Sequence, residues 1–274
     1  MALTIEEKAR RFAALHERPG AFVIPNPWDA GSARLLSGLG FEALATSSGA
    51  CAGVLGRRDG RVLRAEAIAH AKAIVEATDL PVAADLENGF GDTPEDAAAT
   101  IRDAAAIGLV GGSIEDSSGR AEKPIYDADH ALRRVEAAIA AARALPTRFL
   151  FTARAENFIR GNPDLADTIK RLKAYEKAGA DVLFAPGLPD LAAVKEVCAA
   201  LERPFNFMVG IKGRSFTVAD LTAAGVKRIS LATSLYRAAV TGLLDAAREV
   251  KDHGTFGYLD TAIPTPDLNA LLKA

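Results

Sequence analysis

The sequence predicts an α/β fold, specifically a (β/α)8 barrel of the TIM type with an additional C-terminal helical tail. Three observations predict it: eight short apolar runs recur along the 274 residues, stretches with helical spacing separate them, and no glycine-rich turn follows the first run. Eight strand–helix units account for about 250 residues in barrels of this type. We therefore assign residues 1–253 to the barrel domain and residues 254–274 to the tail.

The eight expected strands are apolar runs bounded by turn residues, and most are continuous rather than alternating. Continuous runs are typical of parallel strands that are buried on both faces. A doubly wound open sheet is the alternative fold, but its first strand is normally followed by a glycine-rich turn, and here Pro25, Asn26 and Pro27 follow. The expected strands are 22–25, 43–47, 82–86, 111–115, 149–154, 182–186, 205–209 and 228–232.

Two of the intervening stretches show the helical pattern clearly. In the first, Thr93 can cap the helix, Pro94 suits its first position and Gly108 stops it. In the second, apolar residues from Leu165 onward share one side until Gly179. Each helix is followed by an expected strand, as the barrel requires.

Two loops and the tail depart from the short connections of this architecture. The loops 49–61 and 116–127 follow the second and fourth strands, so both would lie at the C-terminal mouth, either as lids or as surface excursions. The tail is glycine-rich and proline-containing as far as Pro266, and a short apolar helix is expected after it.

Composition excludes several classes of function. The net charge of −2 provides no basic surface for a nucleic acid, and no apolar run approaches the roughly 20 residues that span a bilayer. The two cysteines are too few for a disulfide scaffold, which fits a reducing compartment. We therefore expect a cytoplasmic protein that binds neither nucleic acid nor membrane. The four histidines, including His16, fall in polar or helical contexts and are expected at the surface.

Polar side chains stand where several of the expected strands end, and in a barrel enzyme these ends carry the reacting groups. They are Ser47 and Ser48 in the second strand, Asp85 and Glu87 in the third, Glu115 in the fourth and Arg154 in the fifth.

The carboxylates Asp85, Glu87 and Glu115 crowd negative charge, and such hard oxygen ligands suit Mg2+. The alternative is that the first two cap the next turn and Glu115 pairs with an arginine. Arg154 either anchors a carboxylate or phosphonate or only neutralises these acids. The turn Ser47-Ser48-Gly49 offers hydroxyls and backbone N–H groups to an anion, although such turns are common.

The motifs at these strand ends resemble those of the isocitrate lyase / phosphoenolpyruvate mutase superfamily, with no subtype assigned within its carboxyvinyl-carboxyphosphonate phosphorylmutase-like branch. The resemblance extends from residue 22 to 246 and rests on N-P-W-D-A-G-S-A-R, T-S-S-G, L-G-R-R-D-G, D-L-E-N-G-F-G, S-I-E-D, A-R-A-E-N-F and A-Y-E-K-A-G-A-D. The D-L-E-N-G-F-G and S-I-E-D motifs on successive strands are the most specific.

The resemblance implies a Mg2+ ion bound largely through water, with Asp85 closest and Glu87 and Glu115 in support. It also implies that Ser47, Ser48, Gly49 and Asp85 bind the substrate, that Arg154 contacts its oxygens, and that Asp59 and Glu115 join Arg154 in the catalytic set. Members of the superfamily tend to form tetramers in which a C-terminal helix is swapped, so a homo-oligomer, dimer or tetramer, is expected.

The loop 116–127 departs from the superfamily's known types. It reads D-S-S-G-R-A-E-K-P and lacks the cysteine that serves as general acid in the isocitrate-type lyases. The phosphonate mutases carry an Asn and a Lys soon after the E-D pair and a His that ends the sixth strand; here Ser117, Ser118 and Pro186 are found. Tyr126, Ser117 and a metal-bound water remain alternatives for the proton donor.

These observations predict a Mg2+-dependent lyase or decarboxylase that acts on a 2-oxo acid or a malate-type dicarboxylate through an enolate. One alternative is a phosphonopyruvate-type hydrolase or mutase that acts on a P–C bond. Another is a non-catalytic protein that binds 2-oxo acids.

Overall fold

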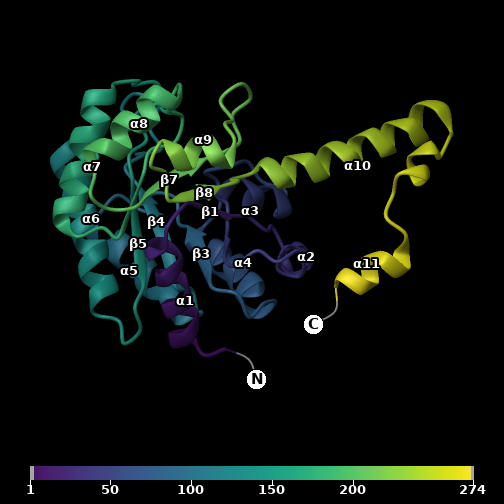
Figure 1. Ribbon diagram of the computed structural model, residues 1–274, viewed down its shortest axis with the longest axis horizontal. Helices are drawn as coiled ribbons and strands as arrows, with labels where there is room; N and C mark the ends of the chain where they lie inside the picture. Colours follow the sequence, from purple (N-terminus) through teal and green to yellow (C-terminus); the bar gives the residue numbers. More distant parts are fainter. Residues whose placement is uncertain (1–2, 273–274) are drawn as a thin grey trace.

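The computed structural model describes residues 3–272 and contains eight parallel strands surrounded by helices (Figure 1). Each predicted run contains one strand, and the ends differ by at most two residues. The strands are β1 Phe22–Ile24, β2 Leu44–Ala45, β3 Val82–Asp85, β4 Gly111–Glu115, β5 Leu150–Arg154, β6 Val182–Phe184, β7 Phe205–Met208 and β8 Arg228–Ser230.

The strands close into a barrel. They follow the order β1-β8-β7-β6-β5-β4-β3-β2, and every pair in this order is parallel. The two ends of this order meet where Ala45 N donates to Pro25 O at 3.0 Å and the Asn26 side-chain amide donates to Thr46 O at 2.8 Å. This closure excludes the open doubly wound sheet and confirms the (β/α)8 barrel.

The helices between the strands include the two whose ends the sequence marked. Thr93 caps α5 through its side chain, and Gly179 ends α7 in the left-handed conformation, with a φ of 106°. The helices that surround the barrel are α2 Ala30–Gly38, α3 Ser48–Val54, α4 Arg64–Glu76, α5 Pro94–Ala106, α6 Ala128–Arg143, α7 Leu165–Ala178, α8 Leu191–Ala200 and α9 Val218–Ala223.

An additional helix, α1 (Ile5–Glu17), closes the amino-terminal end of the barrel. Phe12 is fully buried there and packs with Phe22, Val110 and Leu150. His16 is buried too, and its ring meets the rings of Phe12 and Phe22 edge to face at 4.8 and 4.9 Å. The prediction of a surface position for His16 was wrong, because the apolar face of α1 carries it under the barrel.

The two long connections differ from each other. The segment 49–61 is not a simple loop, because α3 takes up its first part, from Ser48 to Val54. The segment 116–127 has no helix and is held as a flap by an isolated antiparallel bridge between Ser117 and Ile125.

The last long helix, α10 (Ser234–His253), extends away from the barrel, and none of its residues is buried (Figure 1). A short 3-10 helix, η1 (Gly257–Asp260), follows, and α11 (Thr265–Leu271) returns to lie beside α2. The predicted tail helix therefore begins at Thr265, and the predicted tail's last two residues, 273 and 274, lie outside the described part. From residue 3 to 272, no helix is both long and apolar enough to span a membrane.

Candidate active site

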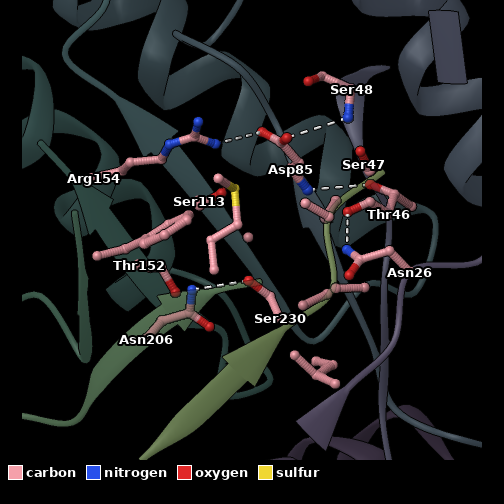
Figure 2. Close-up of a pocket in the computed structure, with 18 of the residues that line it drawn as sticks. Asn26, Thr46, Ser47, Ser48, Asp85, Ser113, Thr152, Arg154, Asn206 and Ser230 are labelled. Atoms are coloured by element: carbon pink, nitrogen blue, oxygen red, sulfur yellow. Dashed lines mark hydrogen bonds and ion pairs between the residues drawn. The ribbon is translucent and has the colours of Figure 1, made fainter. Parts of the chain in front are cut away.

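A cavity of about 230 Å³ opens at the C-terminal ends of the barrel strands, where barrel enzymes place their reacting groups. Six of the predicted site residues line it: Ser47, Ser48, Gly49, Asp59, Asp85 and Arg154. The strand ends therefore bring together residues that are far apart in the chain: Ser47 and Arg154 are separated by 107 positions. In Figure 2, Asp85 and Arg154 point toward each other, and a dashed line joins their charged groups, which lie 3.6 Å apart.

Asp85 is the last residue of β3, and backbone groups fix its carboxylate. Oδ2 accepts a hydrogen bond from Ser48 N and Oδ1 one from Glu87 N, both at 3.2 Å, while Asp85 N donates to Thr46 Oγ1 at 3.1 Å (Figure 2). Asp85 therefore links β3 to the turn at the start of α3. Its oxygens are held toward the cavity by N–H groups.

The Ser47-Ser48-Gly49 turn packs tightly against its neighbours. A Cβ added at Gly49 would lie 2.7 Å from Cγ2 of Thr233 and 3.3 Å from a carboxylate oxygen of Asp59. Only glycine fits without displacing these groups. The turn thus brings its backbone close to Asp59 at the wall of the cavity.

Arg154, the last residue of β5, lies among three acids. Its Nε donates to Glu156, and its Nη1 lies 3.3 Å from Oε2 of Glu115 and 3.6 Å from Oδ1 of Asp85. Burial lowers the pKa of Arg154, but the carboxylates of Glu156, Glu115 and Asp85 raise it by more, so the guanidinium stays charged. Its plane also stacks over Phe184, 4.8 Å from the ring centre.

Glu87 and Glu115 border the cavity without lining it. Glu87 follows β3 with a φ of 48°, and burial raises its pKa to about 7, with further contributions from the carboxylates of Asp85 and Asp59. Burial, followed by repulsion from Glu156, also raises the pKa of Glu115. The raised pKa values of Glu87 and Glu115 indicate that these carboxylates are buried where negative charge is crowded. Additional positive charge at this place would stabilise both carboxylates in their ionised form.

A second cation lies at this site, and the strand-end pattern did not predict it. Arg160 contacts Glu115 Oε1 and Glu156 Oε2, both at 3.1 Å, and its side chain is 40% exposed at the mouth. The spacing of four residues between Glu156 and Arg160 was the available signal. Asn26 was also missed, although the N-P-W-D motif contains it; its amide bridges β1 and the end of β2.

The arrangement fits a hard divalent cation bound mainly through water. In the part of the chain that is described, no three His, Cys, Asp or Glu side chains converge closely enough to hold a metal directly. A carboxylate oriented by backbone N–H groups, with two further acids of raised pKa beside it, suits an ion that keeps several waters, as Mg2+ does. Asp85 would be the residue closest to it.

The flap 116–127 is fastened to the loop after β3. The Tyr126 hydroxyl donates to Asp92 Oδ1 at 2.5 Å, and Arg120 Nη1 donates to Asp92 Oδ2 at 2.8 Å. Burial raises the pKa of Tyr126 to about 12. Neither Tyr126 nor Ser117, two of the candidate proton donors, lines the cavity.

The sequence matches the family model described as phosphoenolpyruvate phosphomutase over residues 12–251, which is most of the chain. The chain belongs to this family. This confirms the resemblance to the isocitrate lyase / phosphoenolpyruvate mutase superfamily that the strand-end motifs indicated.

Individual members of the family were also found. A crystal structure of a candidate lyase or mutase from Burkholderia cenocepacia J2315 is 50% identical, with a TM-score of 0.96, over 98% of this chain and 97% of that one. The 2,3-dimethylmalate lyase of Eubacterium barkeri is 28% identical over 91% of this chain and 89% of the relative. Oxaloacetate acetylhydrolase in complex with oxalate is 25% identical, with a TM-score of 0.88, over 98% and 94%.

Proposed function

We propose that this member of the phosphoenolpyruvate mutase family is a Mg2+-dependent lyase or decarboxylase acting on a 2-oxo acid or a malate-type dicarboxylate through an enolate. The observation that carries the proposal is the ion pair, at the wall of one cavity, between Asp85, fixed by backbone N–H groups, and the buried cation Arg154. Such a pair offers a place for a cation on one side and for an anionic substrate on the other.

The named relatives support the choice of substrate class. Dimethylmalate lyase and oxaloacetate acetylhydrolase are both named for dicarboxylic acids, one of them a 2-oxo acid. One is named a lyase and the other an acetylhydrolase, so both names describe the cleavage of such an acid. We infer the same class of substrate here, without a specific acid.

The roles of the chain's own residues follow from their positions. The hydroxyls of Ser47 and Ser48 and the N–H group of Gly49 bind a substrate carboxylate, and Arg154 donates to other substrate oxygens. Asp85, with Glu87 and Glu115 behind it, would hold Mg2+, which would supply positive charge for an enolate. Asp59, which lines the cavity, belongs to the catalytic set, while Glu115 keeps Arg154 in place.

Two alternatives remain distinguishable by experiment. The family model is described as a phosphoenolpyruvate phosphomutase, so a P–C bond reaction on phosphonopyruvate is the second candidate. In the flap, Ser117 and Ser118 stand directly after the E-D pair, where that chemistry is expected to have an Asn and a Lys. A protein that only binds 2-oxo acids would show ligand-dependent melting shifts without turnover.

We further propose that the chain assembles with copies of itself through α10 and the tail. The helix α10 has no buried residue, and large apolar side chains are exposed along it and beyond it: Leu243, Leu244, Val250, Phe256, Leu259 and Ile263. Contiguous exposed apolar surface indicates a binding partner. A second copy of the chain, giving a dimer or tetramer, is the expected partner.

The function is tested with the purified protein, Mg2+ and a panel of 2-oxo acids and malates, while pyruvate and other cleavage products are followed. Turnover of a dicarboxylic acid that disappears when the metal is chelated would support the proposal. Turnover of phosphonopyruvate alone would favour the P–C bond reaction. Absence of turnover with every acid, in the presence of metal, would refute the lyase.

A further inference from the structure

The candidate active-site cavity extends into the interior of this barrel, and polar side chains line part of its wall. Barrel interiors are usually filled by layers of Val, Ile and Leu side chains. Here the wall of the cavity includes the small residues Ala45, Ala83 and Ser113 and the polar residues Thr152 and Asn206. At about 230 Å³ the space lies below the range of sites for drug-sized ligands, and it therefore suits a small acid.

Arg228 lies at the bottom of this cavity. It is the first residue of β8 and only 7% exposed, and its side chain reaches across the barrel. Its Nε donates to Asn206 Oδ1 at 2.7 Å on β7, and its Nη2 donates to Thr152 Oγ1 at 3.0 Å on β5. The guanidinium thus forms part of the floor, between the cavity and the helix α1 beneath it.

Beneath Arg228 lies His16, which brings no compensating charge. Its Nε2 is 3.5 Å from Arg228 Nη1, and its Nδ1 lies 2.8 Å from the carbonyl oxygen of Phe12, which can only accept. The neutral tautomer with the proton on Nδ1 satisfies both contacts. Burial, and then the Arg228 charge, lower the pKa of His16 to about 3, so the ring is neutral at physiological pH.

No carboxylate among residues 3–272 forms an ion pair with Arg228, and burial alone accounts for the lowering of its pKa to about 9. The buried Arg154 and Arg171, by contrast, pair with carboxylates. A buried charge without a counter-charge is costly. Within residues 3–272, only three of the five guanidinium N–H groups of Arg228 have a hydrogen-bond partner.

We propose that Arg228, with the Thr152 hydroxyl and the Asn206 amide, forms an anion subsite at the floor of the cavity that takes a carboxylate group of the ligand. The role of this subsite in substrate binding rests on the proposed function. In that role, one carboxylate of the substrate is bound beside Asp85 and Arg154, and the other lies below it at Arg228. The subsite would make the protein select dicarboxylates over monocarboxylates.

The subsite itself is tested without any organic acid. Crystals of the protein soaked in bromide should show an anomalous scattering peak beside Arg228, and formate or bromide should raise the melting temperature. The variant Asn206→Asp places a carboxylate at the oxygen that already accepts from Nε, with almost no change in shape. It should melt at a higher temperature than the wild type, and it should lose both the bromide peak and the anion-dependent shift.

The preference for dicarboxylates is tested with lactate and malate, which differ by one carboxylate. Titration calorimetry in the presence of Mg2+ measures the affinity for each acid, and NMR confirms that neither acid is consumed. The wild type should bind malate about tenfold or more tightly than lactate, since a charge-assisted pair is worth at least 1.4 kcal/mol. Asn206→Asp and Arg228→Gln should remove this preference. Arg228→Lys should retain part of it, which covers the case in which Arg228→Gln does not fold.

The matched control is Arg18→Gln. The Arg18 side chain is 41% exposed, pairs with Glu42 and does not line the cavity, so its removal should leave anion binding unchanged. A wild-type crystal with no anion at the floor, or an Asn206→Asp variant that still prefers malate, would overturn the subsite. Bromide at Arg228 without any Mg2+-dependent acid binding would refute the proposed function and leave the subsite standing.

Discussion

Nη1 of Arg154, at the end of β5, lies 3.3 Å from Oε2 of Glu115, at the end of the neighbouring strand β4. Both side chains are almost completely inaccessible to solvent. The pair joins a group proposed to bind substrate to a group proposed to support the metal. A change in either residue is therefore expected to alter both stability and ligand binding.

Removing the arginine should expose this coupling. Arg154→Gln leaves Glu115 and Glu156 without their main counter-charge, so the free energy of unfolding should fall by about 3 to 5 kcal/mol. Saturating Mg2+ should recover part of this loss, because the ion supplies positive charge nearby. Urea unfolding with and without Mg2+ measures both effects. A loss below 1 kcal/mol would contradict the structural role.

The residue placed closest to the metal is Asp85. Asp85→Asn keeps the shape of the side chain but removes its charge, so Mg2+ affinity should fall by roughly tenfold or more. Titration calorimetry measures the affinity directly, and Asp103→Asn on the outside of α5, where Asp103 pairs with Arg64, is the matched control. An unchanged Mg2+ titration in Asp85→Asn would remove this residue from the site.

The buried His16 predicts a dependence of stability on pH. Its pKa is lowered from 6.5 to about 3 in the folded protein, so between these values the unfolded chain binds more protons than the folded one. The free energy of unfolding should therefore fall as the pH drops from about 6.5 toward 3. The complete loss amounts to about 5 kcal/mol, at about 1.4 kcal/mol per pKa unit.

The variant His16→Gln isolates this contribution. It lacks the titrating ring, so its stability should fall less steeply than that of the wild type between pH 6 and about 4. Urea unfolding at a series of pH values gives both slopes. Parallel curves for the two proteins would show that His16 does not stay neutral in the fold.

The hydroxyl of Tyr126 is directed toward Asp92 rather than into the cavity, so Tyr126→Phe should leave turnover within about tenfold of the wild type. The lost hydrogen bond should cost about 1 to 3 kcal/mol in stability, because Asp92 is charged. Steady-state kinetics on whichever acid the panel identifies, with a melting curve, measure both. A loss of about a thousandfold would instead identify Tyr126 as the proton donor.

The exposed apolar residues of α10 and the tail predict self-association. Light scattering should show the full chain as a dimer or tetramer, and the double change Leu243→Glu with Phe256→Glu should shift it toward the monomer. Arg248→Glu on the same helix, at an exposed charged position, is the control. A monomeric wild-type chain at micromolar concentration would contradict the proposal.

Local patterns in the sequence determined the barrel and most of the candidate site. The apolar runs, the cap at Thr93 and the stop at Gly179 depend on neighbouring residues only, and all are found where the sequence predicted them. Because parallel strands share one carboxyl end, the polar residues there had to converge. This rule predicted that Asp85 and Arg154 lie at the same mouth of the barrel.

The tertiary structure alone decided which charges are paired and which are not. Arg160 belongs to the site and His16 to the interior because of contacts across the barrel and beneath it, which no local pattern encodes. Arg228 appeared in the sequence only as the first residue of an apolar run. In the fold, the hydrogen-bond partners of Arg228 are Asn206, Thr152 and His16, and all three are neutral. The buried position of Arg228 among them depends on the whole fold, so no local pattern could predict an unpaired charge there.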